Sequence, residues 1–242
     1  MDHDRMPGVR IGALSVPDGV RVSVAVRDVG SAIAATYGEG SFDTASIVKV
    51  DILAALLVQA EDAGRGLTPQ ERAAADAMIR LSDNAAATEL WRVIGGADGL
   101  TAAHARLGLV ATDPAPSGAW GLTRTTAGDR LTLLEAVFGA GPALNAPSRT
   151  YIQDLMARSA AGQDWGVSAA GPSYALKNGW LPRTATGLWV VNSTGRVTTE
   201  DGRTCLVAVL SDGNADLAAG VSLVEAAARA SVGAVSAAGR TS

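Results

Sequence analysis

Alternating apolar and polar positions predict strands near both ends of the chain. Residues 20–26 alternate in this way, and residues 31–37 follow beyond a Val-Gly turn, which together predict a β-hairpin. Three further strand-like stretches lie late in the chain, at residues 174–177, 187–193 and 204–210. The chain therefore contains two groups of strands, and they are separated by its whole middle section.

The middle of the chain has the apolar spacing of helices. Between residues 47 and 60 only Lys49, Asp51 and Gln59 are polar, and a helix that is apolar nearly all round is typical of a buried helix. Thr68-Pro69 begins the next helix with a proline at its first position. The predicted helices are residues 47–60, 68–80, 85–93, 100–107, 131–138, 148–160 and 216–230, and a frayed tail is expected at 233–242.

This order of elements predicts an α+β fold. An antiparallel sheet forms from both ends of the chain and carries the terminal helix on one face, and an all-helical lobe is inserted between the two groups of strands. We expect residues 1–45 and 172–242 to form the sheet domain and residues 46–171 to form the lobe. A cleft between them is the natural place for a ligand.

Composition narrows the class of protein. The 242 residues are 48% hydrophobic with a net charge of -4, which is typical of a globular chain. The sequence has no stripe of basic residues of the kind that binds nucleic acid. It also has no apolar run of the roughly 18 residues that a membrane span needs. The first 19 residues mix charges and prolines, unlike a signal peptide. The single cysteine, Cys205, predicts a buried inert thiol, and no histidine or cysteine spacing implies a metal or cofactor.

A serine and a lysine three residues apart open the predicted buried helix. Ser46 and Lys49 share one helix face, so their side chains can touch. Of the 20 lysines and arginines in the chain, only Lys49 and Lys177 are lysines. Arginine is effectively never deprotonated, whereas a desolvated lysine can lose its proton and act as a base. We expect Lys49 to activate Ser46, although the pair alone is also typical of a helix start with a surface lysine.

A second motif, Ser82-Asp83-Asn84, follows in a predicted loop of the lobe. Ser82 can relay a proton to a leaving group. Asn84 offers both a hydrogen-bond donor and an acceptor, which suits a substrate amide. Asp83 is also a favourable residue for a turn or helix cap.

A third motif, Lys177-Asn178-Gly179, lies at the end of a predicted strand. The charge of Lys177 favours a substrate carboxylate, and its repulsion would hold Lys49 toward neutrality. Gly179 lets a backbone approach a bound ligand closely.

The three motifs in this order resemble those of the penicillin-recognising serine enzymes, which comprise class A β-lactamases and penicillin-binding DD-peptidases. The resemblance covers nearly the whole chain. It implies an acyl-enzyme on Ser46, with Lys49 as the base, Ser82 as the proton relay, and an oxyanion hole built from the N–H groups of Ser46 and Trp180. It also implies a small-molecule or peptide substrate with a carboxylate, such as a β-lactam or a peptidoglycan peptide, and a secreted or cell-envelope location. A monomer is our default expectation.

Two departures from the family pattern limit the activity expected. Asn178 stands where the family usually has threonine or serine, so recognition of a carboxylate by this residue is altered. The loop at residues 110–124 contains no glutamate, and Asp113 is its only acidic residue. The class A enzymes carry a glutamate in this loop, where it activates the deacylating water. An acylated Ser46 is therefore expected to release a β-lactam slowly.

The sequence leaves a choice of functions. A DD-peptidase-like or esterase-like hydrolase, a transpeptidase or a transacylase fits best. A weak β-lactamase and a non-catalytic binder of the same fold are the alternatives. Trp120 and Trp180 either line an apolar pocket at the cleft or pack in the core. His104 is expected to be structural, and Asp51 lies on a different helix face from Lys49 and is a poor partner for it.

Overall fold

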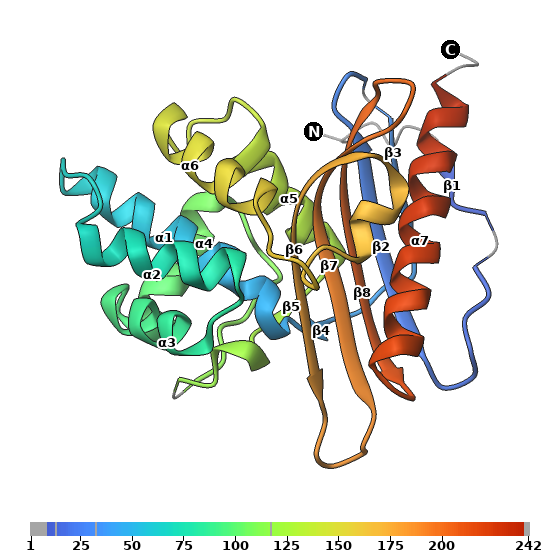
Figure 1. Cartoon of the computed structure of the whole chain (residues 1–242), viewed down its shortest axis with the longest axis horizontal. Coiled ribbons are helices and arrows are strands. Elements are labelled where there is room, and N and C mark those ends of the chain that lie inside the picture. Colours follow the sequence, from blue (N-terminus) through green and yellow to red (C-terminus); the bar gives the residue numbers. More distant parts are fainter. Residues whose placement is uncertain (1–8, 13, 32, 117, 240–242) are drawn as a thin grey trace.

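The computed structural model describes residues 9–12, 14–31, 33–116 and 118–239, and a six-stranded sheet organises them (Figure 1). Its strand order is β1-β3-β2-β8-β7-β6, and every pairing is antiparallel except β1 with β3. Both groups of predicted strands join in it through β2 and β8, which confirms the α+β prediction. The strands are β1 (Val9–Arg10), β2 (Arg21–Asp28), β3 (Ala34–Tyr37), β6 (Ser173–Pro182), β7 (Trp189–Thr198) and β8 (Thr204–Asn214).

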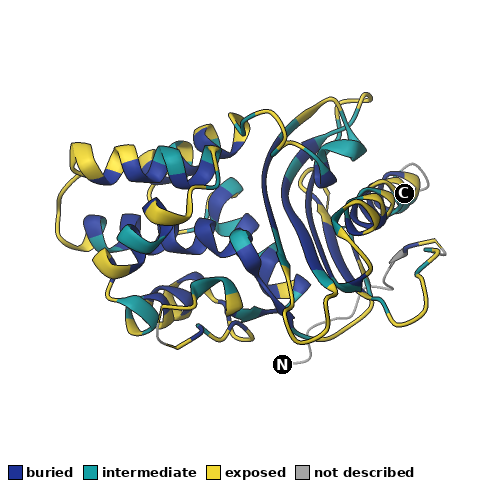
Figure 2. Cartoon of the chain, turned by 60° about the horizontal axis from the view of Figure 1, so that its bottom comes forward, coloured by how far each residue is buried: buried dark blue, intermediate teal, exposed yellow. Residues whose placement is uncertain are grey.

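The helical lobe packs around one buried helix, as Figure 2 shows. This helix, α1 (Val48–Asp62), is buried along nearly its whole length, as its apolar sequence predicts. It contacts the other lobe helices, which are α2 (Pro69–Arg80), α3 (Asn84–Val93), α4 (Gly96–Leu107) and α6 (Ala146–Ala157). Thr68 forms a capping box with Glu71 at the start of α2, and Asp83 caps α3.

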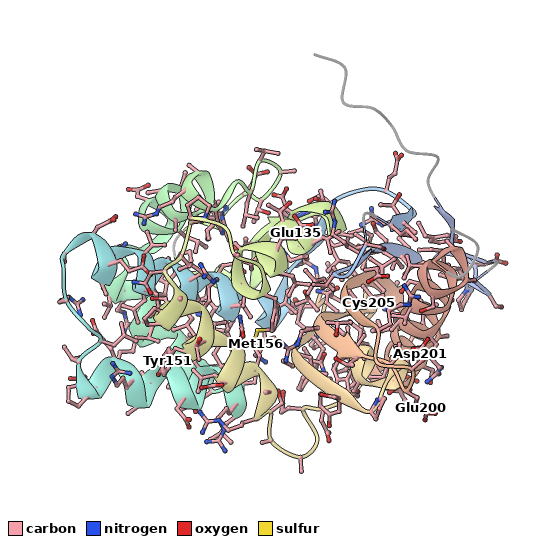
Figure 3. All side chains as sticks on the ribbon, turned by 90° about the horizontal axis from the view of Figure 1, so that it is seen from above. Glu135, Tyr151, Met156, Glu200, Asp201 and Cys205 are labelled. Carbon is pink, nitrogen blue, oxygen red and sulfur yellow. The ribbon has the colours of Figure 1, made fainter. Side chains whose placement is uncertain are left out.

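Two helices cover the sheet. The helix α7 (Leu217–Ala238) contacts β2, β7 and β8, and α5 (Ala127–Phe138) also contacts these strands as well as α4 and α6. By length and composition α7 could cross a membrane, but Val224, Val232 and Val235 are buried in a core cluster that it shares with the strands. Cys205 is buried in β8, and burial raises the pKa of its thiol to about 11 (Figure 3).

Several predicted bounds were wrong. Residues 233–238 do not fray but complete α7, because Val235 is buried in the core. The helix α4 begins at Gly96 and not at residue 100. The prediction missed its first turn because glycine has a low helix propensity. Lys177, predicted to end a strand, lies inside β6, because this strand continues in pairing with β7 as far as Pro182. The last residues of the predicted tail, 240–242, lie outside the described residues.

A small second sheet ties the start of α1 to a loop of the lobe. Its two strands are β4 (Phe42–Asp43) and β5 (Arg124–Thr125), paired antiparallel. Backbone hydrogen bonds between Asp113 and Arg124 close the loop of residues 113–124 beside it. This loop is thereby held next to the turn that carries Ser46.

A buried ionic network that the sequence did not reveal anchors α1. Asp51 accepts a hydrogen bond from Arg130 at 2.5 Å and contacts His104 Nε2 at 2.9 Å, and all three side chains are buried. Burial raises the pKa of Asp51, but the Arg130 charge and the His104 hydrogen bond outweigh it and hold this pKa below its usual value. Asp51 thus pairs with Arg130 and His104 and not with Lys49. This agrees with the prediction that Asp51 and Lys49 lie on different faces of the helix.

Replacing Asp51 tests the weight of this network. Asp51→Asn leaves the Arg130 charge buried without a counter-charge, so we expect the free energy of unfolding to fall by about 3–5 kcal/mol. Asp76→Asn is the matched control, because the Asp76–Arg80 pair is partly exposed to solvent and should contribute less than about 1 kcal/mol. Urea unfolding of both variants measures the difference, and equal losses would contradict a structural role for the network.

Candidate active site

Ser46 lies on a tight turn at the head of α1. The turn is a 3-10 helix, Ala45–Ile47, and Ala45 has the left-handed φ of +48°, which is strained for a residue with a side chain. The Asn192 amide donates to the carbonyls of Asp43 at 2.9 Å and Thr44 at 3.1 Å, and it holds the turn against β7. These contacts leave Ser46 half-buried at the junction of the lobe and the sheet.

Gly179 brings β6 into direct backbone contact with this turn. A Cβ at position 179 would lie 2.6 Å from the Ser46 nitrogen and 2.7 Å from the Ile47 nitrogen. No residue with a side chain fits there without moving the strand or the turn. The close approach expected of Gly179 is therefore made to the turn that carries Ser46. Trp180, the next residue, follows on the sheet's edge strand.

Lys49 is buried and reaches the loop between α2 and α3. Its Nζ donates to the Ser82 carbonyl at 2.7 Å and to Asn84 Oδ1 at 2.8 Å, and it lies 3.1 Å from Ser82 Oγ. The Trp120 ring lies beneath the same amine, with its centroid 5.0 Å from Nζ. The first two motifs predicted from the sequence thus meet at one amine.

Lys177 approaches the same serine from the sheet. Its Nζ lies 3.1 Å from Ser82 Oγ and donates to the Asn178 carbonyl at 3.0 Å. Ser82 has a φ of +58°, a left-handed conformation that costs free energy in a serine. The loop holds this strained residue where its hydroxyl contacts both amines.

Burial depresses the basicity of both lysines. The pKa of Lys49 falls to about 8 because of burial, although the Asp83 carboxylate opposes the shift. The pKa of Lys177 falls to about 7, first because of burial and second because of the Lys49 charge. The predicted repulsion between the two lysines therefore contributes to the lowered pKa of Lys177. Both amines therefore deprotonate far closer to neutral pH than an exposed lysine.

Asn178 is turned away from the two lysines. It lies on the opposite face of β6 from Lys177, because side chains alternate along a strand. Its amide nitrogen donates to the carbonyls of Gln163 at 3.0 Å and Trp165 at 2.9 Å, so both of its N–H groups are used. The side chain predicted to meet a substrate carboxylate instead holds the segment between α6 and β6 against the strand.

A pocket of about 380 Å³ opens beside Ser46. Its described lining residues are Ala45, Ser46, Asn84, Gly118, Ala119, Trp120, Gly121, Leu122, Trp180 and Leu181. Trp120 and Trp180 thus line the pocket, which was one of the two roles left open for them. None of these lining residues is acidic, and Asp113 is exposed beside the loop closure. The lining therefore supplies no carboxylate to activate a water beside Ser46.

Sequence reasoning missed Asp43, which lies three residues before Ser46. The Asp43 carboxylate pairs with Arg124 at 3.2 Å and with Arg183 at 2.8 Å, and these come from β5 and from the hairpin after β6. Asp43 therefore ties the segments that carry Arg124 and Arg183 to the turn that carries Ser46. The only signal of this role in the sequence is that the charged Asp43 directly follows the apolar Phe42.

The sequence model of the beta-lactamase enzyme family matches residues 64–235, which is well over half of the chain. This span contains Ser82 and Lys177 and begins after Lys49. The chain belongs to the beta-lactamase enzyme family.

Solved structures of this family's fold resemble the chain over most of its length. PBP-A superposes with a TM-score of 0.77 at 21% identity, covering 93% of each chain. An acyl-enzyme complex of a PBP-A variant with penicillin G gives a TM-score of 0.78 at 22% identity, covering 96% of this chain and 100% of that one. The TLA-3 extended-spectrum beta-lactamase gives 0.78 at 15% identity, covering 88% and 92%. These likenesses establish the β-lactamase/transpeptidase-like fold.

Among curated proteins, LppW of Mycobacterium tuberculosis, named as a candidate lipoprotein, is 28% identical over 186 residues. The match covers 73% of this chain and 59% of LppW. The same identity and coverage hold for LppW of Mycobacterium bovis. The chain thus spans about 59% of the length of these relatives.

The lysine pKa values can be measured directly, because the chain contains only two lysines. Protein labelled with ¹³C at lysine Cε should show one group titrating near pH 7 and one near pH 8. Lys49→Met removes the neighbouring charge, so the pKa of Lys177 should rise, and Lys177→Met assigns the remaining signal to Lys49. Titration of both lysines above about pH 10 would contradict the burial of the pair.

Proposed function

We propose that this chain is a serine hydrolase or acyltransferase that forms an acyl-enzyme on Ser46. The observation that carries the proposal is the shared contact at Ser82, whose hydroxyl lies 3.1 Å from the amines of both Lys49 and Lys177. Two amines of lowered pKa on one hydroxyl, beside a second serine on a helix-opening turn, form a path for moving a proton. Membership of the beta-lactamase enzyme family supports the same chemistry.

Each residue has a defined step in this proposal. Neutral Lys49 takes the proton of Ser46 as the hydroxyl attacks the carbonyl carbon, and Ser82 passes a proton to the departing group. The N–H groups of Ser46 and Trp180 stabilise the oxyanion, one from the head of α1 and one from the edge strand β6.

The remaining motif residues orient the substrate. Asn84 accepts from Lys49 through Oδ1, and its exposed side chain can donate to a substrate amide through its nitrogen. Lys177 attracts a carboxylate on the leaving group, which would in turn raise its pKa and keep it charged. Asn178 positions the segment of residues 163–166, and Gly179 sets the spacing between β6 and the nucleophile turn.

The pocket favours slow deacylation of β-lactams. Its described lining holds no carboxylate, so no side chain there can draw a proton from an attacking water. A DD-peptidase-like or esterase-like enzyme fits this site better than an efficient β-lactamase. Substrates are small molecules or peptides with a carboxylate, such as β-lactams or peptidoglycan peptides. The protein acts as a monomer, and the lipoprotein name of LppW supports a place at the cell envelope.

Labelling with a fluorescent penicillin tests the proposal. The wild-type chain should form a covalent adduct that Ser46→Ala cannot form. Lys49→Arg should also lose labelling, by about 100-fold or more, because arginine keeps the charge but cannot act as a base. Arg80→Lys, on the lobe surface, is a control that should label normally.

The fate of the adduct separates the alternatives. A lasting adduct supports a DD-peptidase-like site, and rapid release of hydrolysed penicillin would identify a β-lactamase instead. If neither β-lactams nor activated esters modify Ser46, the chain is a non-catalytic member of the fold and the proposal is wrong.

The assignment of Lys49 as the base also predicts the direction of the pH dependence. The neutral amine is the reactive form, and its fraction grows as the pH rises through a pKa of about 8. Acylation of Ser46 by an uncharged ester should therefore increase between about pH 6 and pH 9, with a midpoint near 8. Stopped-flow release of the leaving group measures this rate, and a rate that falls with rising pH would rule out Lys49 as the base.

A further inference from the structure

The pocket beside Ser46 is lined by large apolar side chains and by uncharged polar groups, and none of its described lining residues is charged. Trp120, Leu122, Trp180 and Leu181 supply its large side chains, and the rest of the lining is small or uncharged. Leu122 keeps 41% of its surface exposed, and this surface forms part of the pocket wall. An uncharged apolar group entering the pocket would remove this surface from water.

The two tryptophans are held in place before any ligand arrives. Trp120 Nε1 donates to Thr88 Oγ1 at 3.2 Å, so the polar edge of this ring is already satisfied. Trp180 packs against Trp165 with ring centroids 5.7 Å apart. Their positions present preformed apolar walls, which reduces the ordering cost of binding.

Two arginines that lie close in sequence to the pocket lining are engaged elsewhere. Arg183, two residues beyond Leu181, pairs with Asp43, and Arg124, two residues beyond Leu122, pairs with the same carboxylate. Lys177 is buried on the Ser82 side and is not part of the lining. A negative charge placed in the pocket would therefore lose its water without gaining a partner from the lining.

We infer that the acyl half of the substrate carries an uncharged alkyl or aryl group that binds between Trp120, Leu122 and Trp180. This inference rests on the proposed acyl-enzyme at Ser46. In the reaction, the bond from Ser46 Oγ to the acyl carbon forms and the bond to the leaving oxygen or nitrogen breaks. The serine proton reaches the leaving group through Lys49 and Ser82. Water later releases the acyl group as a carboxylic acid and restores the serine.

Nitrophenyl esters that differ only in the acyl group test this specificity. Acetyl, hexanoyl, phenylacetyl and hemiglutaryl esters share one leaving group, and the hemiglutaryl chain resembles the hexanoyl chain in length but ends in a carboxylate. The rate of nitrophenolate release per unit of ester concentration measures acylation, and mass spectrometry confirms the adduct on Ser46. We expect hexanoyl and phenylacetyl esters to react at least about tenfold faster than acetyl and hemiglutaryl esters.

Variants of Leu122 assign the preference to the pocket. Leu122→Ala should reduce the ratio of hexanoyl to acetyl rates, and Leu122→Lys should reverse the order of hexanoyl and hemiglutaryl esters. Leu188→Ala is the matched control, because this leucine is exposed to a similar degree (39%) and does not line the pocket. Rate ratios cancel any general loss of active protein.

Two failures are distinguishable. If the esters acylate Ser46 at equal rates, or if hemiglutaryl is preferred by the wild type, the apolar specificity is wrong and the acyl-enzyme stands. If no ester modifies Ser46, the proposed function fails and the specificity fails with it.

Discussion

Two buried amines that share one hydroxyl impose the central constraint on this structure. Lys49 comes from the helical lobe and Lys177 from the sheet, and both lie against Ser82 Oγ. Bringing two positive charges together away from water is unfavourable, and the lowered pKa values are the physical result. This unfavourable free energy is located where the helical lobe meets the sheet.

The surrounding backbone holds the lobe and the sheet close together beside the two lysines. Gly179 lets β6 touch the Ser46 turn, and Asn192 and Asp43 secure the turn on either side. Strained backbone conformations occur at Ala45, which precedes Ser46, and at Ser82, which carries the shared hydroxyl. Strain concentrated at such positions is characteristic of residues held for chemistry rather than for stability.

The sequence predicted the parts of this site that follow from local pattern. The order of three short motifs, and the rarity of lysine in an arginine-rich chain, were enough to predict that Lys49, Ser82 and Lys177 lie together. The strand and helix types followed from apolar spacing. The bounds were less accurate at α4 and at the end of α7, where glycine and alanine carry little periodic signal.

Partners that are distant in sequence were not predictable. Nothing in the sequence near Asn178 indicated that its amide would donate hydrogen bonds to the carbonyls of Gln163 and Trp165. The pairing of Asp51 with Arg130 joins residues on separate helices, and no local pattern marks it. Such contacts depend on tertiary packing, which leaves no local pattern in the sequence from which they could be predicted.

The pairing of β2 with β8 has a consequence for how the chain acquires its structure. Arg21 lies opposite Asp212, so two neighbouring strands at the centre of the sheet come from opposite ends of the chain. Closing so long a loop is entropically costly, and folds that depend on such pairings fold slowly, whereas the lobe is built from helices that neighbour one another in sequence. During synthesis, helices α1 to α6 therefore leave the ribosome before the strands β6, β7 and β8 that complete the sheet. Lys177 can meet Lys49 only once synthesis has passed β6, and the sheet that supports it is complete only after β8 emerges.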